Sequence, residues 1–168
     1  MSPKSILFVC MGNICRSPMA EGVFLHILKR EYRDKDFVVD SAGTHGYHVG
    51  ELADSRMRMH AAKRGYTLES RSRKFTRNDF ETFDLIVAMD DANYDDLCDM
   101  TNSAEEKKKI VRMTDYCTKH QATHIPDPYY GGERGFEYVI DLLEDACENL
   151  ISQLIITSTH HHIITSSK

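Results

Sequence analysis

Cys10 and Arg16 stand at the two ends of a short loop, and together they could transfer a phosphoryl group. The loop follows an apolar run at residues 6–9, and Ser17-Pro18 after it is typical of a helix start. The NH groups of such a loop and the positive end of the helix dipole bind a dianion such as phosphate. The same field favours thiolate at Cys10, which makes its sulfur a nucleophile, while Arg16 can grip two phosphoryl oxygens.

The composition of the loop distinguishes this interpretation from an ordinary buried cysteine. A cysteine at the end of a strand is usually an inert, small apolar residue. Here Gly12 and Asn13 are predicted to take left-handed backbone and so to let the loop turn around an anion. The predicted phosphate-binding loop consists of Met11, Gly12, Asn13, Ile14, Cys15, Arg16 and Ser17.

Asp127 is the candidate proton donor that a departing alkoxide or phenolate would need. It lies between two prolines, which restrict its backbone and so its direction. Tyr129 and Tyr130 follow it and offer flat walls for an aromatic ring. Two alternatives stay open: a plain turn around Asp127, and Asp90 as the acid, although Asp90 also suits a helix N-cap.

Apolar runs of strand length alternate along the chain with stretches of helical period. This pattern predicts one α/β domain with a parallel sheet covered by helices on both faces. The predicted strands are residues 6–9, 37–39, 85–89 and 110–113. The polar residues 40–44 should form a loop at the same sheet edge as residues 10–17, because parallel strands all point one way.

Three helices can be placed from apolar spacing. The first presents Ala20, Val23, Phe24, Ile27 and Leu28 on one face, and a second, over residues 54–64, should end at Gly65. The last carries an apolar stripe over residues 136–154 that includes Cys147. We expect residues 1–156 to form the domain and residues 157–168 a polar, solvated tail; its alternative is a metal site at His160, His161 and His162.

Charge and composition exclude several classes of protein. The chain has 168 residues and a net charge of -5 without a long basic run, which gives nucleic-acid binding little support. No stretch reaches the length of a membrane span, and the first apolar run is too short for a secretory signal, so we expect a cytoplasmic protein. Five cysteines without a Cys-x-x-Cys pair indicate reduced thiols rather than disulfides or a zinc site.

Four motifs, in this order, resemble the low-molecular-weight protein tyrosine phosphatases. They lie at residues 9–18, 40–44, 89–90 and 127–130, and the resemblance covers roughly residues 5–154. It implies a four-stranded parallel, Rossmann-like fold and the hydrolysis of phosphotyrosine in proteins and of small aryl phosphates, with no metal or cofactor. Cys10 is then the nucleophile that forms a phosphocysteine, Arg16 the phosphate-binding arginine, and Asp127 the general acid and later the base.

The resemblance also implies supporting roles around the site. Ser17 would donate a hydrogen bond to the thiolate, and Asn13 and Ser41 would hold the loop in shape. Cys15 would be a redox partner of Cys10, with a packed side chain as the alternative. Inorganic phosphate and vanadate are expected as competitive ligands, and the protein as a monomer or weakly self-associating. The residues expected at the substrate entrance are Tyr47, Tyr129 and Tyr130.

Some features depart from the family or fit a rival. The family often has a histidine where this chain has Ser70. Arsenate reductases of this fold need two further cysteines, and residues 82–99 supply Cys98 alone. Protein arginine phosphatases usually carry threonine where this chain has Ile14, which suits a phenyl ring better. A domain that only binds phosphate would lack the nucleophile or the acid. A basic stretch either favours acidic peptides or is a solvated face; it contains Arg56, Arg58, Lys63, Arg64, Arg71, Arg73 and Lys74.

Overall fold

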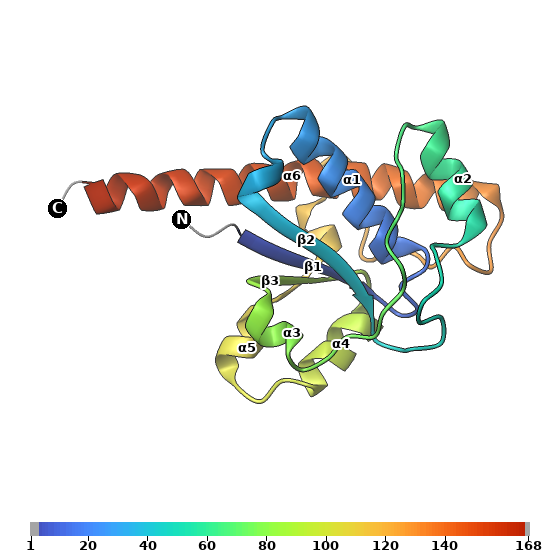
Figure 1. Cartoon of the computed structure of the whole chain (residues 1–168), viewed down its shortest axis with the longest axis horizontal. Helices are drawn as coiled ribbons and strands as arrows, with labels where there is room; N and C mark the ends of the chain where they lie inside the picture. The colour runs from blue at the N-terminus through green and yellow to red at the C-terminus, as the bar shows by residue number, and fades with distance from the viewer. Residues whose placement is uncertain (1–3, 167–168) are drawn as a thin grey trace.

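Four parallel strands form the centre of the molecule (Figure 1). The structure is a computed structural model that describes the backbone of residues 4–166 and the side chains of residues 4–157. The strands are β1 (Lys4–Cys10), β2 (Phe37–Gly43), β3 (Leu85–Ala88) and β4 (Ile110–Arg112), in the order β2-β1-β3-β4. All three pairings are parallel, which confirms the predicted four-stranded parallel sheet.

Helices cover both faces of this sheet, as predicted (Figure 1). One face carries α1 (Arg16–Arg30), α2 (Ser55–Lys63) and α6 (Glu133–Ser166). The other carries α3 (Asp79–Thr82), α4 (Asp91–Asp99) and α5 (Ala104–Lys108). Two short 3-10 helices, η1 (Asp34–Asp36) and η2 (Met113–Tyr116), precede β2 and follow β4.

The apolar run in β1 is buried on both sides. Ile6 and Phe8 pack into the core with α1 and α6, whereas Leu7 and Val9 pack into the core with β3 and α4. This division follows from the alternation of side chains along a strand, and a continuous apolar run is typical of the central strand of a parallel sheet. The burial of β1 on both faces anchors the loop that begins at Cys10.

The second strand is longer than its sequence suggests. Residues 40–43, predicted as loop, continue β2 as far as Gly43, and Ser41, Ala42 and Gly43 pair with Phe8, Val9 and Cys10. Their small side chains fit a buried position beside β1, and the ladder of hydrogen bonds does not depend on side-chain polarity. The prediction of a loop was therefore wrong for these residues, although the segment ends beside residues 10–17 as expected.

The end of α2 agrees with the prediction, and the end of α6 differs from it. Asp54 caps α2, and Gly65 follows it with a φ of 86°. Cys147 is buried in the core, as expected. However, α6 continues to Ser166 and extends past the other elements (Figure 1), well beyond the apolar stripe. The side chains of residues 160–162 lie outside the described part, and the domain boundary at residue 156 stays a prediction.

Within the part of the chain that the structure describes, no helix is both long enough and apolar enough to span a membrane.

Candidate active site

The loop of residues 10–17 lies between β1 and α1, at the edge to which the strands point. The residues after β2 contact it through backbone hydrogen bonds: Thr44 N donates to Cys10 O at 2.9 Å, and His45 N donates to Met11 O at 2.9 Å. The two loops therefore meet at the same edge, as the parallel arrangement predicts.

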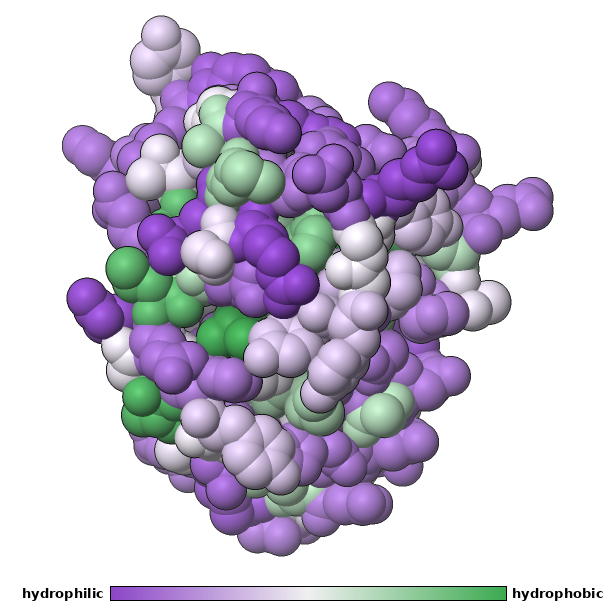
Figure 2. All heavy atoms as spheres, turned by 90° about the vertical axis from the view of Figure 1, so that its right-hand side faces the viewer, coloured by the Kyte–Doolittle hydropathy of each residue, from purple (hydrophilic) through white to green (hydrophobic). Residues whose placement is uncertain are grey.

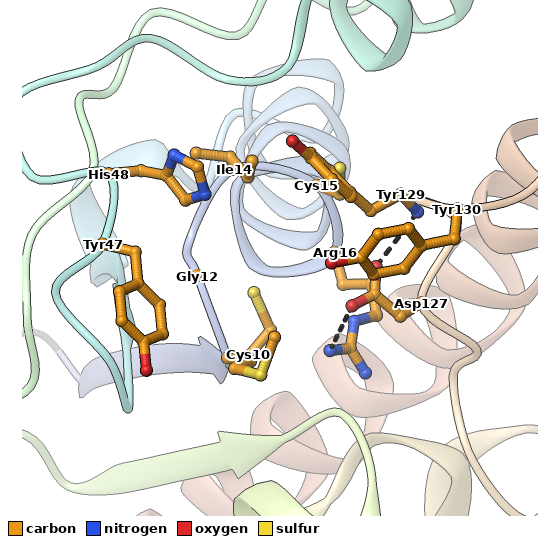
Figure 3. A pocket seen from close by; sticks show the side chains of 11 residues that line it. Cys10, Gly12, Ile14, Cys15, Arg16, Tyr47, His48, Asp127, Tyr129 and Tyr130 are labelled. Atoms are coloured by element: carbon orange, nitrogen blue, oxygen red, sulfur yellow. Dashed lines mark hydrogen bonds and ion pairs between the residues drawn. The ribbon is translucent and has the colours of Figure 1, made fainter.

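A cavity of about 270 Å³ opens over this loop. Figure 2 shows the side of the molecule on which β2 ends, where apolar and weakly polar residues gather among strongly polar ones. The cavity brings together the cysteine, arginine, aspartate and three tyrosines that the sequence singled out (Figure 3). Its lining consists of Cys10, Met11, Gly12, Ile14, Cys15, Arg16, Tyr47, His48, Asp127, Tyr129 and Tyr130.

The amide of Asn13 determines the direction of the hydrogen bonds behind Cys10. Asn13 Oδ1 accepts from the backbone N of Arg73 at 3.0 Å, so its Nδ2 is the side that donates, to Ser17 Oγ at 2.8 Å and to Ser41 Oγ at 3.0 Å. Because Ser17 accepts from Asn13, its own proton can be donated to Cys10 Sγ, 3.0 Å away, with Ala42 O as a more distant acceptor at 3.4 Å. Asn13, Ser17 and Ser41 thus form one hydrogen-bond network with Cys10, and their roles in catalysis stay predictions.

The loop turns at one left-handed residue rather than at two. Asn13 has a φ of 56°, as predicted. The prediction for Gly12 was wrong, because its φ is not in the left-handed range. Its missing side chain instead allows a close approach of His48: a Cβ at Gly12 would lie 3.2 Å from His48 Cδ2. A larger residue at this position would have to move the His48 ring by a few tenths of an ångström.

A buried carboxyl continues the network on the other side of Ser41. Ser41 Oγ donates to Glu21 Oε1 at 3.0 Å. Burial raises the pKa of the Glu21 carboxyl to about 7, although hydrogen bonds from Ser41 and Ser70 act in the opposite direction. The position where the family often has histidine thus still supplies a hydrogen bond. The sequence offered no signal for Glu21, because a glutamate in a helix is ordinarily solvated.

Arg16 is almost fully buried beneath the cavity and is held by two carboxylates. Its Nη1 lies 2.5 Å from Asp90 Oδ2 and donates to Ile125 O at 3.1 Å, and its Nη2 lies 3.5 Å from Asp127 Oδ2. Burial acts to lower the pKa of the Arg16 guanidinium, but Cys10, Asp90 and Asp127 outweigh it and raise that pKa. The arginine therefore stays charged and aimed at the loop.

Asp90 is the alternative acid that the structure places outside the cavity. Its Oδ1 accepts from Asn93 N at 2.8 Å, which confirms the predicted N-cap of α4. Its other oxygen is bonded to Arg16. Because both oxygens are engaged and Asp90 does not line the cavity, its position favours a supporting role. Sequence reasoning found the cap but missed the bond to Arg16.

Asp127 lines the cavity on the side opposite Tyr47 (Figure 3). One oxygen accepts from Tyr129 N at 3.1 Å and the other points toward Arg16. About a third of the side chain is exposed, so a leaving group could reach it. Tyr47 lies across the cavity from Tyr129 and Tyr130 (Figure 3), which agrees with the expected entrance.

Cys15 is a buried, free thiol at the start of α1. Burial raises the pKa of this thiol strongly, and the charges of Asp54, Cys10 and Asp127 add to the effect. A packed side chain and a redox partner are both compatible with this position, so the redox role stays a prediction.

A second missed feature is the segment that supports the loop from outside. Ser72 Oγ donates to Gly12 O at 3.0 Å, and Gly43 N donates to Arg73 O at 2.9 Å. His48 lines the cavity and is bonded to Glu51 at 2.7 Å. The contacts of Ser72 and Arg73 join distant parts of the sequence, so no local pattern could have indicated them, whereas His48 and Glu51 are three positions apart.

The basic stretch is partly neutralised by carboxylates of the chain itself. Arg64 binds Glu137, Asp141 and Glu144 of α6. Arg73 and Arg56 also pair with neighbouring aspartates. These three arginines are therefore neither free to bind an acidic peptide nor simply exposed to solvent.

Comparisons with known proteins agree on one family. The family model described as low molecular weight phosphotyrosine protein phosphatase matches residues 5–158. A crystal structure of a protein tyrosine phosphatase from Entamoeba histolytica superposes with a TM-score of 0.89 at 50% identity, covering 92% of this chain and 99% of the other.

Two curated relatives extend this result across distant organisms. The low molecular weight phosphotyrosine protein phosphatase of Homo sapiens is 38% identical over 89% of this chain and 95% of its own length. The low molecular weight protein-tyrosine-phosphatase YfkJ of Bacillus subtilis is 34% identical over the same shares. With the family model matching nearly the whole chain, this protein belongs to the low molecular weight phosphotyrosine protein phosphatases, and it is a hydrolase that acts as a protein tyrosine phosphatase.

Proposed function

We propose that the protein hydrolyses phosphotyrosine, and small aryl phosphates, through a phosphocysteine on Cys10. In the first step the Cys10 thiolate attacks phosphorus in line and the bond to the tyrosine oxygen breaks. Arg16 and the NH groups of residues 11–17 hold the other phosphoryl oxygens, and the Asp127 carboxyl gives its proton to the departing phenolate. No metal or cofactor takes part.

The second step returns the enzyme to its starting state. Asp127, now a carboxylate, accepts a proton from a water molecule as that water attacks phosphorus. The sulfur–phosphorus bond breaks, inorganic phosphate forms and the Cys10 thiolate is regenerated. The same contacts should hold free phosphate or vanadate, so both are proposed as competitive ligands.

One observation carries this proposal: Cys10, Arg16 and Asp127 all line one cavity, and Arg16 Nη2 lies 3.5 Å from Asp127 Oδ2. A tetrahedral dianion bound by Arg16 would then have the sulfur on one side and the acid on another. Ile14 in the lining adds an apolar contact that suits the phenyl ring of tyrosine.

The test is a Cys10→Ser variant. We expect turnover of phosphotyrosine peptides to fall by a factor of roughly 10³ or more, because a serine hydroxyl is a far weaker nucleophile without a neighbouring base. Binding of inorganic phosphate should survive, since the loop amides and Arg16 remain. Release of phosphate and equilibrium binding measure the two effects, and near-normal turnover would refute the covalent route.

A panel of substrates separates this activity from its relatives. Peptides that carry phosphotyrosine, phosphoarginine or phosphoserine should be compared side by side, with arsenate reduction as a further assay. We expect phosphotyrosine to be hydrolysed fastest. Faster release from phosphoarginine would overturn the preference for an aryl ester.

We further propose that Cys15 protects Cys10 during oxidation. Hydrogen peroxide converts the Cys10 thiol to a sulfenic acid and releases water. The Cys15 thiol then attacks that sulfur, a disulfide forms and a second water leaves. Both cysteines lie on one tight loop and both line the cavity, which supports the pairing.

A further inference from the structure

Arg56, near the start of α2, lies between the phosphate-binding loop and the loop that carries Asp127. On the first side, Asp54 N donates to Ile14 O at 2.8 Å, which ties the cap of α2 to the phosphate-binding loop. The Asp54 carboxylate receives Arg56 Nε at 3.1 Å and Nη2 at 2.9 Å. This two-point contact orients the plane of the guanidinium.

On the second side, the same guanidinium contacts the loop after Asp127. Arg56 Nη2 donates to Tyr129 O at 3.1 Å, and its central carbon lies 5.3 Å from the centre of the Tyr129 ring and 5.0 Å from that of Phe136. Phe136 belongs to α6, so the arginine touches both the loop and the helix that follows it. A cation–π contact and a hydrogen bond therefore both join Arg56 to Tyr129.

Tyr129 in turn binds the carboxylate of Asp127 through its backbone. Tyr129 N donates to Asp127 Oδ1 at 3.1 Å, so the peptide unit that Arg56 fixes is close to the one that orients the carboxylate. The residues before Asp127 are anchored separately, because Ile125 N donates to Met89 O at 2.8 Å. Arg56 gives a side-chain hydrogen bond to the backbone of residues 127–132 from α2, whereas Gly135 N of the following helix donates to Gly132 O at 2.9 Å.

We propose that Arg56 is a positioning residue that sets the Asp127 carboxyl relative to the phosphate-binding loop. The inference rests on the proposed role of Asp127 as the general acid. A lysine could not replace the arginine here, because it lacks the flat, two-pronged surface that binds Asp54 and Tyr129 at once. Arg56 acts through Asp127, and its loss should matter only where the reaction needs the proton.

The experiment compares leaving groups of different acidity. Tyrosine is a weakly acidic phenol and needs protonation as it leaves, whereas 4-nitrophenol is more acidic and needs it less. For Arg56→Ala we expect kcat/KM to fall about ten-fold with a phosphotyrosine peptide and by less than about two-fold with 4-nitrophenyl phosphate. Arg56→Lys should show the same selectivity, and activity on 4-nitrophenyl phosphate reports that each variant is folded.

Arg58→Ala is the matched control. Arg58 lies on the same helix, and its Nε donates to Ala53 O at 2.9 Å, within its own segment. We expect this variant to hydrolyse both substrates within about two-fold of the wild type, since an exposed side chain of this kind seldom matters. Equal losses for both substrates in Arg56→Ala, or no loss, would overturn the positioning role.

A double variant separates this inference from the proposed function. For Asp127→Ala alone, kcat/KM should fall about 100-fold or more with the phosphotyrosine peptide and by less with 4-nitrophenyl phosphate. In that background Arg56→Ala should cost nothing further, because the group that it positions is absent. If Asp127→Ala shows no dependence on the leaving group, the acid assignment itself fails. If it does and Arg56→Ala still lowers the rate in the double variant, only the positioning role fails.

Discussion

The orientation of one amide, that of Asn13, organises the hydrogen bonds around the nucleophile. Its oxygen is occupied by the backbone of Arg73, so both of its N–H bonds point toward serine hydroxyls. Those hydroxyls can then donate onward, Ser17 to Cys10 and Ser41 to Glu21. A buried network in which every group is satisfied is rigid, and rigidity is what an anion site requires.

Glu21 should make the stability of the fold depend on pH. Burial raises the pKa of its carboxyl from 4.5 to about 7, so between these values the folded protein holds a proton that the unfolded chain releases. The stabilisation is complete below the lower value and is lost as pH rises through the higher one. Relative to Glu21→Gln, the free energy of unfolding of the wild type should therefore fall by on the order of 3 kcal/mol from pH ~4.5 to pH ~8.

Denaturant unfolding at a series of pH values measures this difference. Glu69→Gln is the matched control, because Glu69 is exposed and lines, together with Glu21, a cavity separate from the candidate active site. The control should follow the wild type at every pH. A Glu21→Gln variant whose stability runs parallel to that of the wild type would mean that the carboxyl is ionised throughout.

Cys15 has a testable consequence of its own. After peroxide treatment followed by a thiol reductant, we expect Cys15→Ala to recover less activity than the wild type, by a factor of about two or more, because its Cys10 proceeds to irreversible oxidation states. Cys98→Ala is the control, since Cys98 lies on α4 and does not line the cavity. Full recovery of Cys15→Ala would remove the protective role.

The start of α4 shows one residue that serves both a secondary-structure element and the site. Asp90 caps the helix with one oxygen and holds Arg16 with the other. Asparagine is as good an N-cap as aspartate but carries no charge. The two contributions of Asp90 can therefore be separated by substitution.

We expect Asp90→Asn and Asp90→Ala to weaken phosphate binding to a similar degree, because both remove the charge that orients Arg16. Only Asp90→Ala should also lose the cap, which makes it less stable than Asp90→Asn by about 1 kcal/mol. Inhibition by inorganic phosphate and denaturant unfolding measure the two quantities. Unchanged phosphate affinity in Asp90→Asn would show that Arg16 does not depend on this carboxylate.

The arrangement of the whole fold explains why the site forms at this edge. The central position of β1 between β2 and β3 places the cysteine loop beside the end of β2 and near the start of α4. The segment before α6 crosses the same edge and delivers Asp127 (Figure 1). Contacts between the end of α2 and α6, such as Arg64 with Glu137, stabilise the helix that carries Arg56 and the helix that follows the loop of Tyr129.

Local patterns in the sequence determined the parts of this protein that depend on near neighbours. The apolar run before Cys10, the turn at Asn13, the end of α2 at Gly65, the cap at Asp90 and the buried face of α1 all follow from residues a few positions apart. Such features depend on backbone preferences and periodicity, which act over short distances. The parallel sheet follows from the same periodicity.

Tertiary structure alone decided the contacts that join distant segments. No spacing of residues in the sequence predicts that Asp90 binds Arg16, that Glu21 is buried next to Ser41, or that Arg56 contacts Tyr129. The length of β2 was also decided this way, because its small polar residues are strand only where β1 pairs with them. A hydrogen bond or ion pair forms when folding brings its two partners together. Because these partners are far apart in the sequence, no local pattern indicates that they meet.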